Sequence, residues 1–121
     1  MSAESRAQRA DVKVQLKAVR VLADMLSRDL PPANWTVYPL KPPHLYGQVV
    51  HSGAETPNGI SAAHDEIEQW ARFLGVDVVA QPHTPYETIH LMAEGVYEGV
   101  EVDVAAIIPD DGGAWRERLG R

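Results

Sequence analysis

The stretch from Ser61 to Ala80 constrains the fold most, because it predicts a helix that leads directly into a buried strand. Ser61 is a good N-cap residue, since its hydroxyl can accept a hydrogen bond from a free backbone N–H of the first turn. Gly75 stands where a left-handed residue commonly ends a helix. The apolar residues recur at helical spacing: Ala63, Ile67, Trp70, Ala71 and Leu74. The β-branched run 76–80 then predicts a strand, which we expect Pro82 to end.

A long first helix is expected from about residue 5 to residue 30, because Pro31 and Pro32 cannot continue it. Two apolar strips run along the surface of this helix. The wider strip contains Val12, Leu16, Val19, Leu22, Ala23, Leu26 and Leu30. The narrower strip contains Val14, Ala18, Val21 and Met25. If the wider strip covers the sheet, the narrower strip has no obvious cover.

Four further strands are expected, at 34–38, 45–51, 87–94 and 100–108. The last two form a hairpin that we expect to close across Val96 and Gly99. This register places two apolar sets on one face: Ile89, Leu91 and Ala93 with Val100, Val102, Val104, Ala106 and Ile108. A slip of one residue would turn one set to solvent.

The expected fold class is therefore α+β, with the order α-β-β-α-β-β-β and two helices packed on one face of a mostly antiparallel sheet. The length of 121 residues suits one domain, 1–121. Residues 110–121 form either a flexible tail or a docking segment that uses Trp115 and Leu119.

Composition excludes several classes of function. The chain has no cysteine, which rules out a thiol nucleophile, a disulfide framework and a cysteine-based zinc site. The formal charge of −6 argues against tight wrapping of nucleic acid by the whole domain. We find no signal peptide and no long apolar run, so we expect a soluble cytoplasmic protein without a membrane segment.

Catalytic and cofactor signatures are absent from the sequence. The segment 59–63 lacks the second glycine of a nucleophile elbow, and it follows a polar loop. His51 and Ser52 are adjacent in sequence, which does not give triad geometry. We also find no phosphate-binding loop and no zinc-protease motif. The sequence therefore predicts a non-enzymatic protein without a cofactor.

Basic residues form a third strip on the first helix. It contains Arg6, Arg9, Lys13, Lys17, Arg20 and Arg28, six of the 11 basic residues, and Asp24 interrupts it. Such spacing can neutralise successive phosphates, so Arg6, Arg9, Lys13, Lys17 and Arg20 are candidate contacts to nucleic acid or to an acidic partner. A solvated helix face explains the strip equally simply, and we favour that interpretation because no aromatic residue interleaves to stack on bases.

Five histidines raise the possibility of a metal site. The hairpin register places His90 near Asp103, with Glu101 and Glu94 further along the same face. Such a face can bind a divalent cation through imidazole and carboxylate groups, which is an alternative function as a metal protein or enzyme. A wet sheet surface is the commoner outcome, so we expect no metal.

The uncovered apolar residues suggest self-association. The candidate residues are Val14, Ala18, Val21, Met25, Met92 and Ile107. Exposed apolar patches tend to mark interfaces, which favours a protein–protein assembly module, most simply a homodimer. The alternative is that the Trp115 tail covers the helix.

Four segments carry a resemblance to a group of known proteins: LPPANWTVYPL, GQVV, EQWARFLGVDVV and YEGVEVDVAAI. Together they resemble small actinobacterial and prophage-type α+β proteins, to which no activity is assigned. The resemblance implies a bacterial, intracellular accessory role without catalysis, and it carries over no site residue.

Overall fold

The computed structural model describes residues 3–83 and 87–110, with side chains from residue 12 onward. Its elements are α1 (Ala3–Leu26), β1 (Ala33–Tyr38), β2 (His44–Val49), α2 (Pro57–Leu74), β3 (Val79–His83), β4 (Thr88–Tyr97) and β5 (Val100–Pro109). The predicted α+β class and element order are confirmed. The predicted docking residues Trp115 and Leu119 lie outside the described residues.

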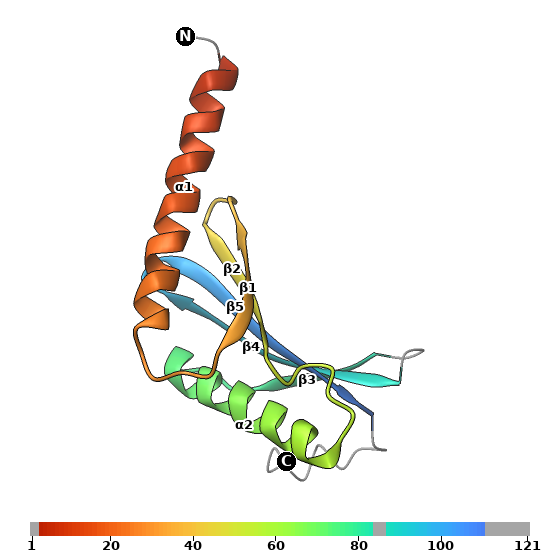
Figure 1. The fold of residues 1–121 in the computed structure, drawn as a ribbon. Helices are drawn as coiled ribbons and strands as arrows, with labels where there is room; N and C mark the ends of the chain where they lie inside the picture. Colours follow the sequence, from red (N-terminus) through yellow and green to blue (C-terminus); the bar gives the residue numbers. More distant parts are fainter. Residues whose placement is uncertain (1–2, 84–86, 111–121) are drawn as a thin grey trace.

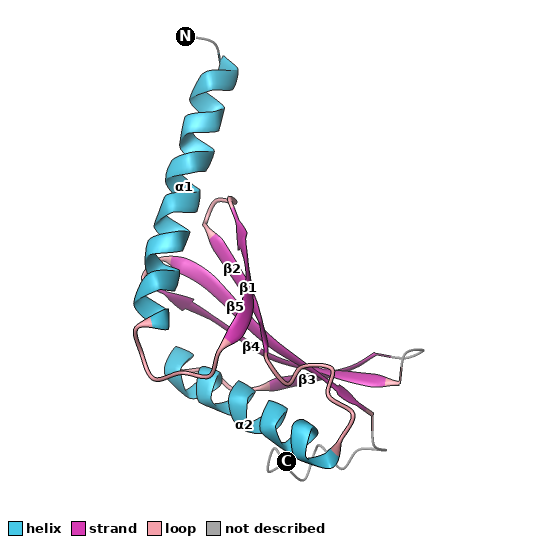
Figure 2. Ribbon diagram, in the orientation of Figure 1, coloured by secondary structure: helices cyan, strands magenta, loops and turns pink. Residues whose placement is uncertain are grey.

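The described strands form one sheet in the order β1-β2-β5-β4-β3. Strands β2 and β5 are parallel, and the other neighbouring pairs are antiparallel. Both helices lie on the same face of the sheet (Figures 1 and 2). Helix α2 packs on β4, β5 and β2, whereas α1 packs on β1, β2 and β5. The expected two-layer arrangement is thus confirmed.

The β4–β5 hairpin has the expected faces but a different closing pair. Tyr97 pairs with Val100, so the register is displaced by two residues from a closure across Val96 and Gly99. A displacement of two residues keeps every side chain on its face, because successive side chains alternate. The loop residues Glu98 and Gly99 have φ values of 52° and 78°. This geometry is typical of the two-residue turn that matches the strand twist.

Helix α2 begins four residues before the predicted N-cap, so the assignment of Ser61 to that role is wrong. Thr56 is the N-cap, and its side chain accepts a hydrogen bond from the N–H of Gly59. Pro57 fits the first helical turn because its missing N–H has no partner there in any case. The carboxyl end agrees with the prediction, since Gly75 is left-handed with φ 71° and ψ 32°.

Strand β3 runs through Pro82, which was expected to end it. The strand lies at the edge of the sheet, where Pro82 pairs with Ile89 of β4. An edge strand tolerates proline because one side of its backbone needs no hydrogen bonds to a neighbour. Helix α1 also differs from the prediction, since it ends at Leu26, before Leu30.

The core under α2 is built around two tryptophans. Trp70 is almost fully buried, and its indole N–H donates to the carbonyl of Pro31 at 2.9 Å. The Trp35 ring meets Trp70 edge to face, with centroids 5.3 Å apart. Gly47, opposite Trp35 on β2, leaves room for this ring, because a Cβ there would lie 2.9 Å from it.

We predict that Gly47→Ala lowers the free energy of unfolding by about 1–3 kcal/mol, since overpacking forces the Trp35 ring to move. Urea denaturation measures this change. In a Trp35→Leu background the same substitution should cost less, because the smaller side chain leaves room for the methyl group. Equal costs in both backgrounds would contradict the proposed contact.

Candidate interaction surface

The narrower apolar strip of α1 packs against the sheet, so its expected role as a free surface is wrong. Ala18 and Met25 are 0% exposed and Val21 is 7% exposed, while Val14 is partly buried. The small side chain of Ala18 allows the helix to approach the strands closely. Leu22 and Leu30 of the wider strip are partly buried against the same core.

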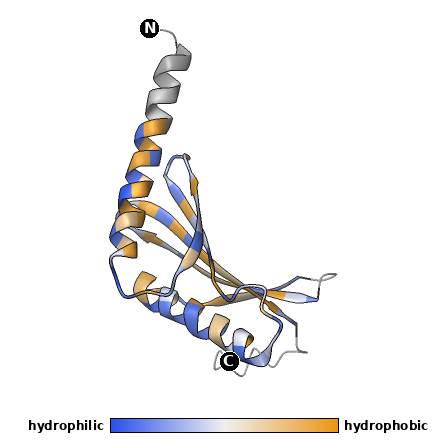
Figure 3. Ribbon diagram, in the orientation of Figure 1, coloured by the Kyte–Doolittle hydropathy of each residue, from blue (hydrophilic) through white to orange (hydrophobic). Residues whose placement is uncertain are grey.

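The wider strip faces away from the sheet instead. Val12, Leu16, Val19 and Leu26 are 62%, 46%, 44% and 59% exposed, and Ala23 is also exposed. We call these five residues the outward strip. The amino-terminal part of α1 also projects beyond the strands (Figure 1), and Figure 3 shows apolar residues along the part of α1 whose side chains are described. Sequence reasoning assigned the two strips the wrong way round. The outward strip and the narrower strip both alternate between spacings of four and three residues, so the local pattern of the sequence does not distinguish them.

A polar contact holds the carboxyl-terminal end of α1 against β4. The Tyr97 hydroxyl donates to Asp24 at 2.5 Å, and Arg28 donates to the Tyr97 oxygen at 2.9 Å. The Phe73 ring of α2 lies 4.8 Å from the Tyr97 ring between centroids. The hydrogen bond from Tyr97 lowers the pKa of Asp24 below its ordinary value. The same bond raises the pKa of Tyr97 above its ordinary value.

The basic strip lies beside the outward strip. Lys13, Lys17 and Arg20 are exposed, and the Lys17 amino group sits over the Gly99 turn. Arg28 is engaged with Asp24 and Tyr97. Arg6 and Arg9 also belong to α1, but their side chains lie outside the described part of the chain.

The opposite face of the sheet carries a histidine–carboxylate pair that differs from the predicted one. His90 pairs with Ile107, while Asp103 pairs with Glu94, so the expected proximity of His90 and Asp103 is wrong. The parallel neighbour β2 instead brings His44 Nε2 to 2.6 Å from Asp103 Oδ2. His90 stacks on His83 with centroids 4.7 Å apart.

These groups do not assemble into a metal centre. Among the residues that the structure describes, no three histidine or acidic side chains are arranged to hold an ion. Glu101 Oε2 lies 4.0 Å from His44 Nδ1, too far for a hydrogen bond. Glu94, Glu101 and Asp103 line a shallow depression of about 280 Å³.

The apolar candidates on this face are less exposed than the outward strip. Met92 and Ile107 are partly buried, and Ala105 of β5, which pairs with Met92, is 0% exposed. Neither helix covers this face (Figure 2). Met92 and Ile107 therefore add only a minor apolar area to any interface.

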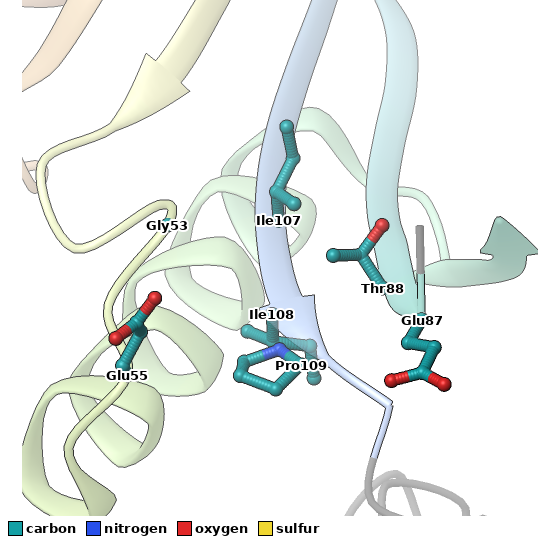
Figure 4. Close-up of a pocket in the computed structure, with 7 residues that line it drawn as sticks. All are labelled: Gly53, Glu55, Glu87, Thr88, Ile107, Ile108 and Pro109. Carbon is teal, nitrogen blue, oxygen red and sulfur yellow. The ribbon is translucent and has the colours of Figure 1, made fainter. Parts of the chain in front are cut away.

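A second depression, of about 230 Å³, lies beside the carboxyl end of β5. It is lined by Gly53, Glu55, Glu87, Thr88, Ile107, Ile108 and Pro109 (Figure 4). Its two carboxylates lie on opposite sides of Pro109 in this view. Small-molecule sites usually enclose about 300–1,000 Å³, so this depression is small for one.

Ser52 and His51, which are adjacent in the sequence, each contact another element of the fold. The Ser52 hydroxyl accepts a hydrogen bond from the N–H of Ile107 at 2.9 Å. His51 Nδ1 lies 2.7 Å from a carboxylate oxygen of Glu66 on α2. These contacts tie the loop after β2 to β5 and α2.

Comparisons with models of protein families, with curated proteins and with solved structures found no match. Within the described ranges, neither helix combines the length and apolar character required to span a membrane. The function must therefore be argued from the surfaces of the chain itself.

We predict that Tyr97→Phe lowers stability near neutral pH, because Asp24 loses a hydrogen-bond donor. The lowered pKa of Asp24 means that this contribution is present above about pH 4 and disappears as pH falls through the lowered value. The raised pKa of Tyr97 means that the contribution of this hydrogen bond to stability is present below about pH 10. The contribution disappears as pH rises through the raised value. Urea denaturation of both proteins across this range measures the difference.

Tyr38→Phe is the matched control, since it removes a hydroxyl from an exposed tyrosine on the other face of the sheet. Its effect on the free energy of unfolding should be small. A Tyr97→Phe effect that stayed constant from acid to alkali would contradict the role of the Asp24 contact.

Proposed function

We propose that the protein is a small non-enzymatic assembly module that forms a homodimer through the outward strip of α1. The exposure of the outward strip, on the side of the helix away from the core, carries this proposal. A helix with apolar residues on two sides is normally buried on both sides. One side of α1 is buried by its own sheet, and a second copy is the simplest cover for the other.

The extent of the outward strip separates it from ordinary surface composition. Single exposed apolar side chains are normal on soluble proteins and need no explanation. Here five residues follow one line from Val12 to Leu26, with no charged residue within the line. A continuous apolar stripe of this kind tends to mark a contact with another protein.

We predict that Leu16→Glu raises the dimer dissociation constant at least about 100-fold, because it places unpaired carboxylates in an apolar contact. Light scattering and sedimentation measure the mass across a range of concentrations. Gln69→Glu is the matched control, since it adds the same charge at an exposed position of α2.

The control should keep the mass of the unchanged protein, and both variants should keep its circular dichroism spectrum. A monomeric unchanged protein at all concentrations would contradict the proposal. That outcome would instead favour a cover supplied by the chain itself, with residues 111–121 as the candidate segment.

Nucleic-acid binding is the second candidate function, favoured by the exposure of Lys13, Lys17 and Arg20 along one side of α1. Cations at this spacing can follow a phosphate backbone. The net charge of −6 opposes this function, because the rest of the surface repels phosphates.

For this candidate we predict an affinity for DNA or RNA that falls steeply as salt increases, since each phosphate contact releases counterions. Fluorescence anisotropy with labelled oligonucleotides measures it. The double variant Lys13→Glu, Arg20→Glu should abolish binding, whereas Lys41→Glu, a change in the β1–β2 connection, should not. Absent or salt-independent binding would reject the candidate.

A further inference from the structure

The outward strip has the spacing of a coiled-coil seam. Its residues are separated by four, three, four and three positions from Val12 to Leu26. In heptad notation Val12, Val19 and Leu26 occupy d positions, while Leu16 and Ala23 occupy a positions. An average repeat of 3.5 residues keeps a seam facing a second helix.

We propose that the partner of this seam is the α1 helix of a second copy, lying parallel and in register. This inference rests on the proposed self-association and adds the orientation of the two chains. It assigns the contact to like positions, so that Val12 of one copy faces Val12 of the other.

Charge beside the seam favours the parallel orientation. Lys13 and Arg20 occupy the e positions on one flank, while Gln15 and Leu22 occupy the g positions on the other. In a parallel pair, e positions face g positions of the partner, so Arg20 meets Gln15. In an antiparallel pair, e positions face each other, and Lys13 would meet Arg20 twice. Like charges in contact oppose that arrangement.

The position of the sheet also permits the parallel orientation. The sheet packs on Ala18, Val21 and Met25, which lie away from the seam on the helix circumference. Two domains can therefore lie at the same end of a helix pair without meeting across it. The projecting amino-terminal part of α1 leaves the beginning of the seam clear of the strands (Figure 1).

The length of the seam suits a modest affinity. Residues 12–26 span about 21 Å of helix, or about two heptads. An isolated helix of that length is marginal in water. Here, however, α1 is already ordered by its own sheet and by the Asp24–Tyr97 contact, so association costs less conformational entropy.

Cysteine cross-linking tests the orientation, and the absence of native cysteines makes the result unambiguous. The variants are Val12→Cys and Ala23→Cys, with chains of each carrying tags of different mass. A disulfide requires Cα atoms about 4.4–6.8 Å apart. Positions 12 and 23 are separated by about 16 Å along a helix, so one orientation cannot produce the links of the other.

We predict that each variant forms disulfide dimers with itself in a glutathione redox buffer, and that mixtures form no link between position 12 and position 23. Lys17→Cys is the control, because it is exposed on α1 but lies away from the seam. It should link at least about tenfold more slowly than Val12→Cys, since its thiols cannot approach to bonding distance in the pair.

Links only between positions 12 and 23, with a dimeric mass, would overturn the parallel orientation and leave the self-association standing. A dimeric mass without links at either seam position would also overturn the orientation, because it would place the contact elsewhere. A monomeric mass without links would overturn both proposals.

Discussion

The choice of the face that α1 presents to the sheet determines the rest of the surface. Ala18, Val21 and Met25 meet the strands, and the Asp24–Tyr97 hydrogen bond holds the helix at that rotation. A rotation that brought Val19 and Leu26 inward would separate Asp24 from Tyr97. The core packing and this hydrogen bond therefore favour the same rotation of α1 about its axis. In that rotation the outward strip is exposed.

The parallel pairing of β2 with β5 has a similar effect on the uncovered face of the sheet. It places β5 between β2 and β4, so each outward side chain of β5 has neighbours on both sides. Asp103 thus meets His44, which is 59 positions away in sequence, while Ala105 is fully enclosed. The result is a polar face with local pairs but without the third ligand of a metal site among the described residues.

Periodicity in the sequence was sufficient to predict the α+β class, the element order and the shared apolar face of β4 and β5. It failed where two structural assignments fitted the local sequence equally well. Both strips of α1 are apolar and helical in spacing, so the long-range contact with Tyr97 had to decide between them. Pro82 suggested the end of a strand because its tolerance depends on an edge position, which strand order sets. Thr56 and Ser61 are both good N-caps, and the proline after Thr56 favours the earlier start.

The distribution of charge gives the two candidate functions opposite responses to salt. Residues 1–30 carry six basic and four acidic side chains, whereas residues 31–121 carry five basic and 13 acidic ones. Two parallel copies place two acidic domains at the same end of a helix pair, where they repel each other. Salt screens that repulsion over distances of about 8–10 Å and leaves the apolar seam intact, so it strengthens the dimer. Phosphate binding by the basic strip weakens under the same change, because releasing counterions into a more concentrated salt solution gains less entropy. The sign of the salt dependence therefore separates an assembly surface from a nucleic-acid surface on the same helix.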